Sequence, residues 1–389
     1  MSALNHTIGR VLMQRLSPDP RNVATFLAAV IGLLASRNVC LPSWLSWTSW
    51  GIKAGSGVRR FARWLGNSSI LPDVWFAPIF RYAMRDWTDM PIFLALDTSM
   101  LYDRFCCVRI SMIYMNRAIP VAWLVLEHKS STVKYTQYGH LLDRVEALLP
   151  RDVEVIFLAD RGFVSKELMR HLQKLRWSWR IRIKSNQKLL SRGQIVALKT
   201  LPLTPGKVLL FSRSIDFGQG LRGISLSAGW AKGSSEPWYV LSGDAASTEV
   251  FIDYARRFGI EESFRDEKSG GFDLEESRIR GVEKLERLIL VIATASIVAV
   301  SEGLSVSLLG KREQVDPHWR QGLSYFQMGL RWILSCVIQG VEKVFAHCLL
   351  RSSNNPIPVA PTEKESRRRY KMKNPQTLFK DVQFFGPLT

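Results

Sequence analysis

The stretch "PIFLALD" (residues 91–97) is a continuous apolar run that ends in a carboxylate. Two more strand-like runs follow it, and a fourth apolar run, "VEVIFLAD" (153–160), also ends in Asp. Segments with helical spacing lie before and after the fourth run. Runs this apolar predict strands that are covered on both faces. The predicted order over residues 91–184 is therefore β-β-β-α-β-α-β, with the other strands at 107–115, 118–127 and 177–184.

Asp97 and Asp160 end two of these predicted strands. The carboxyl end of a buried strand is the rim where α/β sheets place their sites. In a sheet of the ribonuclease H type the first and fourth strands are neighbours, so the two Asp side chains are expected side by side. Two charges that close require a divalent cation, or one takes up a proton. Alternatively, a lone Asp after a strand is a common helix cap or turn former.

A second segment, "YARRFGIEESFRDEKSG" (254–270), has the composition of a helix. Five of its residues recur at i, i+3, i+7, i+11 and i+14, which places them on one narrow stripe at about 100° per residue. Glu262 and Glu267 lie off this stripe and are expected to face solvent. The stripe consists of Tyr254, Arg257, Glu261, Arg265 and Lys268.

The stripe and the two strand-end Asp residues predict one site. A helix beside the sheet can aim Glu261 at Asp97 and Asp160, and three carboxylates can hold two metal ions about 3.5–4 Å apart. Oxygen ligands without nearby Cys or His favour Mg²⁺ or Mn²⁺. The stripe's bases and phenol would then contact DNA phosphates. The alternative is an ordinary amphipathic helix with i,i+4 pairs of Glu261 to Arg257 and to Arg265.

The overall charge also favours a nucleic-acid partner. The chain has 389 residues, 47% of them hydrophobic, a formal net charge of +19 and a pI near 10.0. Such a surplus indicates a polyanionic partner, although a basic protein without one is the plainer alternative. The length predicts more than one average domain and a large core.

The N-terminal region, residues 1–90, is expected to be a helical DNA-binding domain. It contains ten Lys or Arg and four Asp or Glu, and Arg59, Arg60 and Arg63 occupy neighbouring helical positions. A solvated basic face is an equally simple interpretation. The other predicted divisions are a catalytic core at 91–184 and 241–310, a β-rich insertion at 185–240, and a C-terminal helical region at 311–389 with a basic tail at 366–373.

The five cysteines, at positions 40, 106, 107, 336 and 348, show no metal-ligand spacing, and an odd count favours a reducing compartment. The first residues lack the pattern of a signal peptide. The most apolar run, 288–300, is too short to span a bilayer of about 30 Å and is expected to be a core helix. These features predict a cytoplasmic protein.

The chain resembles a known family at the same residues. The spacing Tyr254-x2-Arg257-x3-Glu261-x6-Lys268 matches the Y-(2)-R-(3)-E-(6)-K signature of insertion sequence family 4 transposases, which are DDE cut-and-paste enzymes of bacterial mobile elements. The segments "LDTS" (96–99) and "ADRGF" (159–163) look like that family's first and second Asp motifs. The resemblance extends to roughly residue 305. It implies three catalytic and metal-binding residues: Asp97, Asp160 and Glu261.

The resemblance also implies a mechanism and partners. Water frees a 3′-hydroxyl at the transposon end, this hydroxyl forms a DNA hairpin on the opposite strand, and the opened end joins target DNA. Members of the family use Mg²⁺ and act as dimers on paired terminal repeats, which implies a nucleoid-associated protein. A Trp of the insertion stabilises a flipped base in the family, and Trp238 in "EPWYVLSG" has a similar context, with a core Trp on a strand as the alternative.

Weaker DNA-contact candidates are Arg182 and Lys184 in "RIRIKSN" and Arg161 beside Asp160. Two other functions are compatible with the same residues. One is a decayed or domesticated protein that binds terminal repeats without cutting. The other is a ribonuclease H-like nuclease that hydrolyses DNA without joining it.

Overall fold

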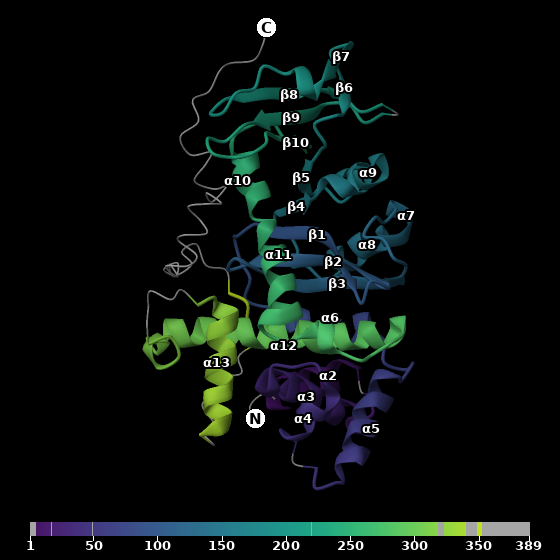
Figure 1. Ribbon diagram of the computed structural model, residues 1–389, viewed down its shortest axis with the longest axis vertical. Coiled ribbons are helices and arrows are strands. Elements are labelled where there is room, and N and C mark those ends of the chain that lie inside the picture. The colour runs from purple at the N-terminus through teal and green to yellow at the C-terminus, as the bar shows by residue number, and fades with distance from the viewer. Residues whose placement is uncertain are drawn as a thin grey trace.

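The computed structural model describes residues 5–16, 18–48, 50–218, 220–317, 323–339 and 348–351. Within these residues one sheet of ten strands forms the centre of an α/β fold, in the order β3-β2-β1-β4-β5-β10-β9-β8-β6-β7 (Figure 1). The strands are β1 (Ile92–Leu101), β2 (Phe105–Tyr114), β3 (Arg117–Glu127), β4 (Val155–Ala159), β5 (Ser178–Arg182), β6 (Lys188–Ser191), β7 (Gln194–Ala197), β8 (Val208–Asp216), β9 (Ile224–Gly229) and β10 (Trp238–Ser242).

The first five strands follow the order predicted from the sequence. β2 pairs antiparallel with both β1 and β3, whereas β1 pairs parallel with β4 and β4 parallel with β5. Helices α7 (Tyr135–Tyr138) and α8 (His140–Glu146) connect β3 to β4, and α9 (Lys166–Lys174) connects β4 to β5. Cys106 and Cys107 lie on β2, as expected of strand residues.

The predicted β-rich segment extends the same sheet. β10 pairs antiparallel with β5, β9 with β10, and β8 with β9. Hydrogen bonding therefore runs without interruption from the core strands into this segment, whose last strand ends at Ser242. Short 3-10 turns lie at Arg161–Phe163, Leu198–Thr200, Leu274–Glu276 and Arg312–Gln314.

The N-terminal residues are helical, as predicted, and helices α2 to α5 lie beneath α12 (Val282–Leu308) in Figure 1. Buried Arg287 of α12 fastens them to the core: its Nε donates to the Ile70 carbonyl at 2.9 Å and its Nη1 to the Leu65 carbonyl at 3.0 Å. A cation near the last carbonyls of a helix is favourable. The N-terminal elements are a π-helical turn (Asn5–Gly9), α2 (Arg10–Leu16), α3 (Pro20–Ser36), α4 (Leu41–Leu45), α5 (Ala54–Leu65) and α6 (Pro72–Ala83).

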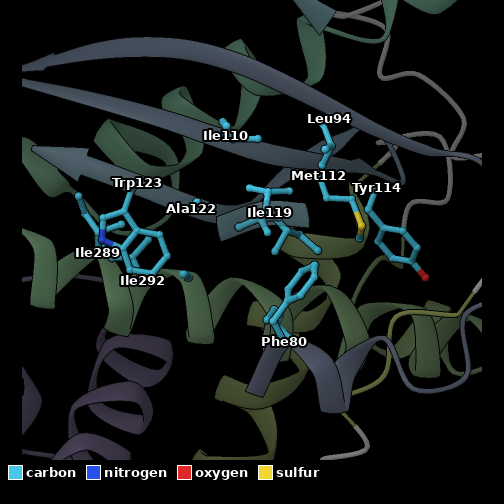
Figure 2. Packing of buried hydrophobic residues seen from close by; sticks show 14 of the residues in the cluster. Phe80, Leu94, Ile110, Met112, Tyr114, Ile119, Ala122, Trp123, Ile289 and Ile292 are labelled. Carbon is cyan, nitrogen blue, oxygen red and sulfur yellow. The ribbon is translucent and has the colours of Figure 1, made fainter. Parts of the chain in front are cut away.

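One face of the sheet packs on α12 and α6. Figure 2 shows Trp123 of β3 beside Ile289 and Ile292 of α12. The Trp123 ring meets Phe76 of α6 edge-on at 5.3 Å, and its Nε1 donates to the Glu286 carbonyl of α12 at 3.1 Å. The large aromatic side chain therefore ties both helices to the edge strand β3.

Helix α12 contains the apolar run 288–300 and is a core helix, as predicted. By length and composition alone it could cross a membrane, but 94% of its most apolar window is buried inside the protein. It crosses α13 (Tyr325–Ile338) at two glycines. A Cβ at Gly303 would collide with the Tyr325 carbonyl, and a Cβ at Gly329 would collide with the Ala299 carbonyl. Side chains at either position would force the two helices apart. The predicted basic tail, 366–373, lies outside the described residues.

Candidate active site

Strand alternation turns both predicted Asp residues toward one helix. Ala95 of β1 and Leu158 of β4 share a buried cluster with Ile260 of α11 (Phe258–Arg265). Because side chains alternate between the faces of a strand, Asp97 and Asp160 continue these two rows on the α11 side.

Asp97 does not end its strand, so that part of the prediction is wrong. β1 continues to Leu101 because it pairs with β2 along its whole length. Its pairing with β4, however, ends at Leu96 and Ala159. Asp97 and Asp160 are therefore the first residues beyond the last parallel pair, and they lie next to each other at this edge.

Small residues allow α11 to lie close to the sheet. Ala95 and Ala118 are both buried in the cluster with Ile260. The Ser263 hydroxyl of α11 accepts a hydrogen bond from the Ala118 backbone N–H at 2.6 Å. A Cβ at Gly259 would lie 3.4 Å from Ile113 of β2, so the start of α11 is close against the β2–β3 hairpin. This approach brings Glu261 over the carboxylates of the sheet.

Arg257, at the start of α11, bridges two of the three carboxylates. Its Nη1 donates to Asp97 Oδ2 at 2.9 Å and its Nη2 to Glu261 Oε1 at 2.5 Å. The Arg257 side chain is 7% exposed, whereas that of Glu261 is 47% exposed. The guanidinium is thus a buried internal cation, with its outer carboxylate partner accessible from solvent.

Burial raises the pKa of the Asp97 carboxyl, and the neighbouring Glu261 and Asp160 add to this rise while Arg257 opposes it. Burial alone would lower the pKa of Arg257. Attraction to Tyr254 and to the carboxylates outweighs burial, so the pKa of Arg257 is raised. The cluster therefore strongly favours a positive charge at its centre.

Two buried polar atoms beside the ion pair make no hydrogen bond of ordinary geometry with the described residues. They are the Tyr254 hydroxyl and the Arg257 Nε. Tyr254 is fully buried, and burial raises the pKa of its phenol. A buried polar atom left without any partner costs about 1–3 kcal/mol, so a water molecule, an ion or a ligand is expected to satisfy such atoms.

Trp238 packs directly behind these residues. Its ring is edge-on to Tyr254 at 5.4 Å and stacked with Phe258 at 6.0 Å. The Arg182 guanidinium lies 5.5 Å from the ring centroid. Trp238 is only 8% exposed, so in this conformation it is a core residue on a strand, the alternative interpretation of its sequence context.

The segment 254–270 is not one continuous helix, contrary to the prediction. It comprises the end of α10 (Glu249–Ala255), then α11, then a π-helical turn at Asp266–Gly270. Bonds of the i→i−3 type join α10 to α11, from the Arg257 N–H to the Tyr254 carbonyl and from the Ile260 N–H to the Arg257 carbonyl. A helical projection at 100° per residue therefore describes only part of this segment, because it assumes one continuous α-helix.

The break separates the members of the predicted stripe. Tyr254, Arg257 and Glu261 remain together. Arg265 is 57% exposed and pairs with Glu262 at 2.9 Å, away from the carboxylate cluster. Lys268 lies on the π-helical turn, where its Nζ donates to the Met100 carbonyl of β1 at 3.0 Å and lies 3.1 Å from Glu275.

Glu267 is buried, so its predicted position facing solvent is wrong. It accepts a charge-assisted bond of 2.7 Å from Arg109, and the two side chains are 6% and 2% exposed. The π-helical turn changes the angle per residue after Arg265, which rotates Glu267 inward. Arg109 lies opposite Asp97 in the β1–β2 register, and it covers the Phe264 ring at 4.3 Å.

Arg109 is therefore a second buried arginine at this site, and the sequence reasoning missed it. One signal could have revealed it. Arg109 interrupts the apolar run "CVRISMIYM", and a charged residue within a strand that is buried on both faces requires a buried partner.

The weaker DNA-contact candidates lie at the surface or in ion pairs. Arg161 is exposed, and its backbone N–H donates to the Asp160 carboxylate, which caps the short 3-10 turn. Arg182 pairs with Glu236 at 2.6 Å, and Lys184 is exposed.

On α5, the three predicted arginines differ. Arg60 donates to the Thr25 hydroxyl at 2.9 Å and covers the Trp50 ring at 4.1 Å. Arg59 and Arg63 are exposed.

The carboxylates of the cluster are ligands of the type that hard divalent cations prefer, but two of them are already bound to a guanidinium. Carboxylate oxygens are the ligands that Mg²⁺ and Mn²⁺ prefer, and Asp97 and Glu261 already share one cation, the Arg257 guanidinium. Among the described residues no three His, Cys, Asp or Glu side chains stand close enough to form a metal centre. The described geometry is thus an ion pair centred on Arg257, and a metal ion between Asp97 and Glu261 would have to replace the guanidinium.

This geometry defines a class of protein, namely an α/β enzyme whose carboxylates lie together at the rim of the sheet. The family model described as "Transposase DDE domain" matches residues 86–298, more than half of the chain. The chain therefore belongs to the transposase DDE domain family and is an enzyme of DNA transposition. Enzymes of this family generally use divalent metal ions.

No curated protein matches the chain. Among solved structures, it is similar to one described as the cryo-EM structure of piggyBac transposase synaptic complex with hairpin DNA. The sequence identity is 13% and the TM-score 0.46, over 95% of this chain and 85% of that chain. The family match, not this likeness, carries the identification.

Proposed function

We propose that this enzyme is a cut-and-paste transposase of the insertion sequence family 4 type, with a ribonuclease H-like catalytic core. The strand order β3-β2-β1-β4-β5, antiparallel at β2 and parallel from β1 to β5, supports the ribonuclease H-like assignment. The observation that carries the proposal is the convergence of Asp97 and Glu261 on one guanidinium, with Asp160 beside Asp97.

In this proposal Asp97, Asp160 and Glu261 hold divalent cations, Mg²⁺ by preference and Mn²⁺ as a substitute. When bound, such ions activate a water molecule or 3′-hydroxyl and stabilise the leaving oxygen of a phosphodiester. Asp97 sits on the rigid central strand and Glu261 on a helix packed against it, so the ligand positions are held by packed elements rather than by mobile loops.

The polar groups around the carboxylates would bind the DNA backbone. The Arg257 Nε and the Tyr254 hydroxyl are donors that a phosphate oxygen could bind if the packing over these buried atoms opened. Lys268, whose side chain is 29% exposed beside Met100 of β1, would contact a second phosphate. Arg265 is exposed and would contribute through its charge.

Three steps follow from the proposed chemistry. In the first, water forms a new P–O bond while the bond to the 3′ oxygen breaks, which leaves a 3′-hydroxyl at the transposon end. That hydroxyl then attacks the opposite strand to form a hairpin. After the hairpin is hydrolysed, the end joins target DNA. Base flipping onto Trp238 would require its ring to leave the Tyr254 and Phe258 packing.

The remaining contacts in the proposal are with the DNA outside the carboxylate cluster. Arg161, Arg182 and Lys184 would follow the strand beyond Asp160, and Arg59, Arg60 and Arg63 would contact the terminal repeat. A homodimer on paired ends would bring two such sites together. A bacterial enzyme of this kind would act in the cytoplasm on the nucleoid.

A cleavage assay on labelled transposon ends tests the proposal. Asp97→Asn, Asp160→Asn and Glu261→Gln should each lower single-turnover cleavage at least ~10³-fold, because each removes a charged ligand. Glu262→Gln is the matched control: it lies next to Glu261 but faces solvent and pairs with Arg265. DNA binding, followed by anisotropy, should change little in any of the four.

The products separate the competing functions. Nicks followed by hairpins and joined target DNA support the transposase. Nicks without joining indicate a nuclease. Binding without any cut, in Mg²⁺ and Mn²⁺ alike, indicates a decayed or regulatory protein. Wild-type cleavage by Glu261→Gln would show that the carboxylate assignment is wrong.

A further inference from the structure

A basic groove lies between the two N-terminal helices α2 and α6, outside the candidate active site. It encloses ≈ 720 Å³, and α2 and α6 form its walls. Arg10 and Arg15 line it from α2, and Arg81 and Arg85 line it from α6. None of its lining residues is an Asp or Glu. We call this feature the α2–α6 groove.

The four arginines are exposed, and weak contacts orient them. Arg81 donates to the Ala147 carbonyl at 2.9 Å. Arg85 lies 4.0 Å over the Tyr82 ring and 3.6 Å from Asp86. An exposed ion pair of this kind contributes only about 0–1 kcal/mol. The positive charge of the groove is therefore directed at solvent and available to an external anion.

Apolar side chains also line the groove. They are Val11 of α2 and Val74, Ala77 and Pro78 of α6. Guanidinium groups on both walls can each bind phosphate oxygens in a bidentate manner. A row of phosphates passing between the helices would be neutralised from both sides.

We infer that the α2–α6 groove binds the phosphate backbone of duplex DNA. This inference rests on the proposed function, which supplies a DNA substrate. Single-stranded DNA fits less well because such sites use exposed aromatic rings on which bases stack. Among the lining residues Tyr82 and His6 have aromatic rings, and Arg85 already covers the ring of Tyr82. The inference adds a second DNA-binding surface to the one proposed for the three arginines of α5. It places the contact with the DNA backbone between α2 and α6.

Salt-dependent binding tests the inference. The probe is a labelled duplex of the transposon end, compared with a scrambled duplex, over a series of KCl concentrations. Two double variants are used: Arg10→Gln with Arg15→Gln, and Arg81→Gln with Arg85→Gln. Each should weaken binding to both duplexes about tenfold or more. Each should also reduce the slope of log K against log salt by about two, because one neutralised phosphate contributes about 0.9.

The matched control is Arg151→Gln with Arg176→Gln, which removes the same charge. Both residues are exposed and lie in the loops that lead into β4 and β5, at the opposite end of these strands from Asp160. This variant should keep the wild-type salt slope. Thermal melting of all variants shows whether they are folded.

A wild-type slope in both groove variants would overturn the inference, as would an equal loss in the control. Stronger binding to anionic lipid vesicles than to the duplex, lost in the groove variants, would also overturn it. The proposed function can fail separately. If the wild-type protein binds DNA through the groove but never cuts it, the groove inference holds and the proposed transposase function is wrong. If the wild-type protein cuts DNA and the groove variants bind DNA as the wild type does, the proposed function holds and the groove inference is wrong.

Discussion

Arg257 holds Asp97 across 160 positions of the sequence, with an Nη1 to Oδ2 distance of 2.9 Å. The same guanidinium holds Glu261 through Nη2. The three side chains form a partly buried unit with one positive and two negative charges at the rim of the sheet. Two neighbouring carboxylates repel each other, and either a guanidinium or a metal ion between them can offset this repulsion.

Arg257→Met should therefore raise the affinity of the DNA-free protein for Mn²⁺ by about tenfold or more. Loss of the internal cation leaves Asp97 and Glu261 facing each other, and tenfold corresponds to about 1.4 kcal/mol, less than the roughly 4 kcal/mol of two charges 4 Å apart near a protein surface. Titration calorimetry measures the change. Arg256→Met, an exposed neighbour that covers Phe93 at 4.4 Å, should leave the affinity unchanged. Equal affinities in wild type and Arg257→Met would contradict the competition.

The Arg109–Glu267 pair should be strongly coupled. Removal of one partner leaves an uncompensated buried charge, so Arg109→Met and Glu267→Met should each lower the free energy of unfolding by about 3–5 kcal/mol. The double variant should recover much of this loss, because two apolar side chains replace a desolvated pair. Urea unfolding of the four proteins gives the coupling energy. Additive losses would show that the two residues act separately.

The crossing of α12 and α13 should not tolerate a methyl group. Gly303→Ala places a Cβ against the Tyr325 carbonyl, which forces backbone movement and should cost about 1–3 kcal/mol. Gly55→Ala is the control, since nothing lies within 4 Å of its Cβ and the residue is within α5. That variant should gain up to about 1 kcal/mol from helix propensity. Thermal melting measures both, and a stable Gly303→Ala protein would place the helices further apart than described.

Glu286→Gln should stabilise the protein at neutral pH. Burial raises the pKa of this carboxyl above its ordinary value of 4.5, while its Oε1 accepts a bond from the Val125 N–H at 3.1 Å. Below pH 4.5 the group is protonated in both folded and unfolded chains. As pH rises through the folded-state pKa, the unfolded chain releases its proton more readily, so wild-type stability falls relative to the variant.

Melting temperatures of wild type and Glu286→Gln between pH 4 and 8 measure this difference, which should grow with pH. Glu146→Gln, an exposed residue on α8, should show no such trend. A difference that shrinks as pH rises would show that the ionised Glu286 is stabilising.

Much of the fold could be predicted because it depends on local periodicity. The apolar runs that end at Asp97 and Asp160 are continuous and short, which favours covered strands over helices, and their order implies which strands are neighbours. Period-two alternation then places both carboxylates on one face. The short spacing from Arg257 to Glu261 keeps these two together within one helical turn.

The sequence by itself thus determined the strand order, the helical N-terminal region and the residues that can form a carboxylate cluster. Only the tertiary structure decided where 254–270 breaks, that Glu267 turns inward, and that Arg257 bridges Asp97 and Glu261. The reason is that these features depend on partners far away in the chain. Arg109, 158 positions from Glu267, is a buried charge that must be neutralised, and a helical projection made from one segment contains no information about it.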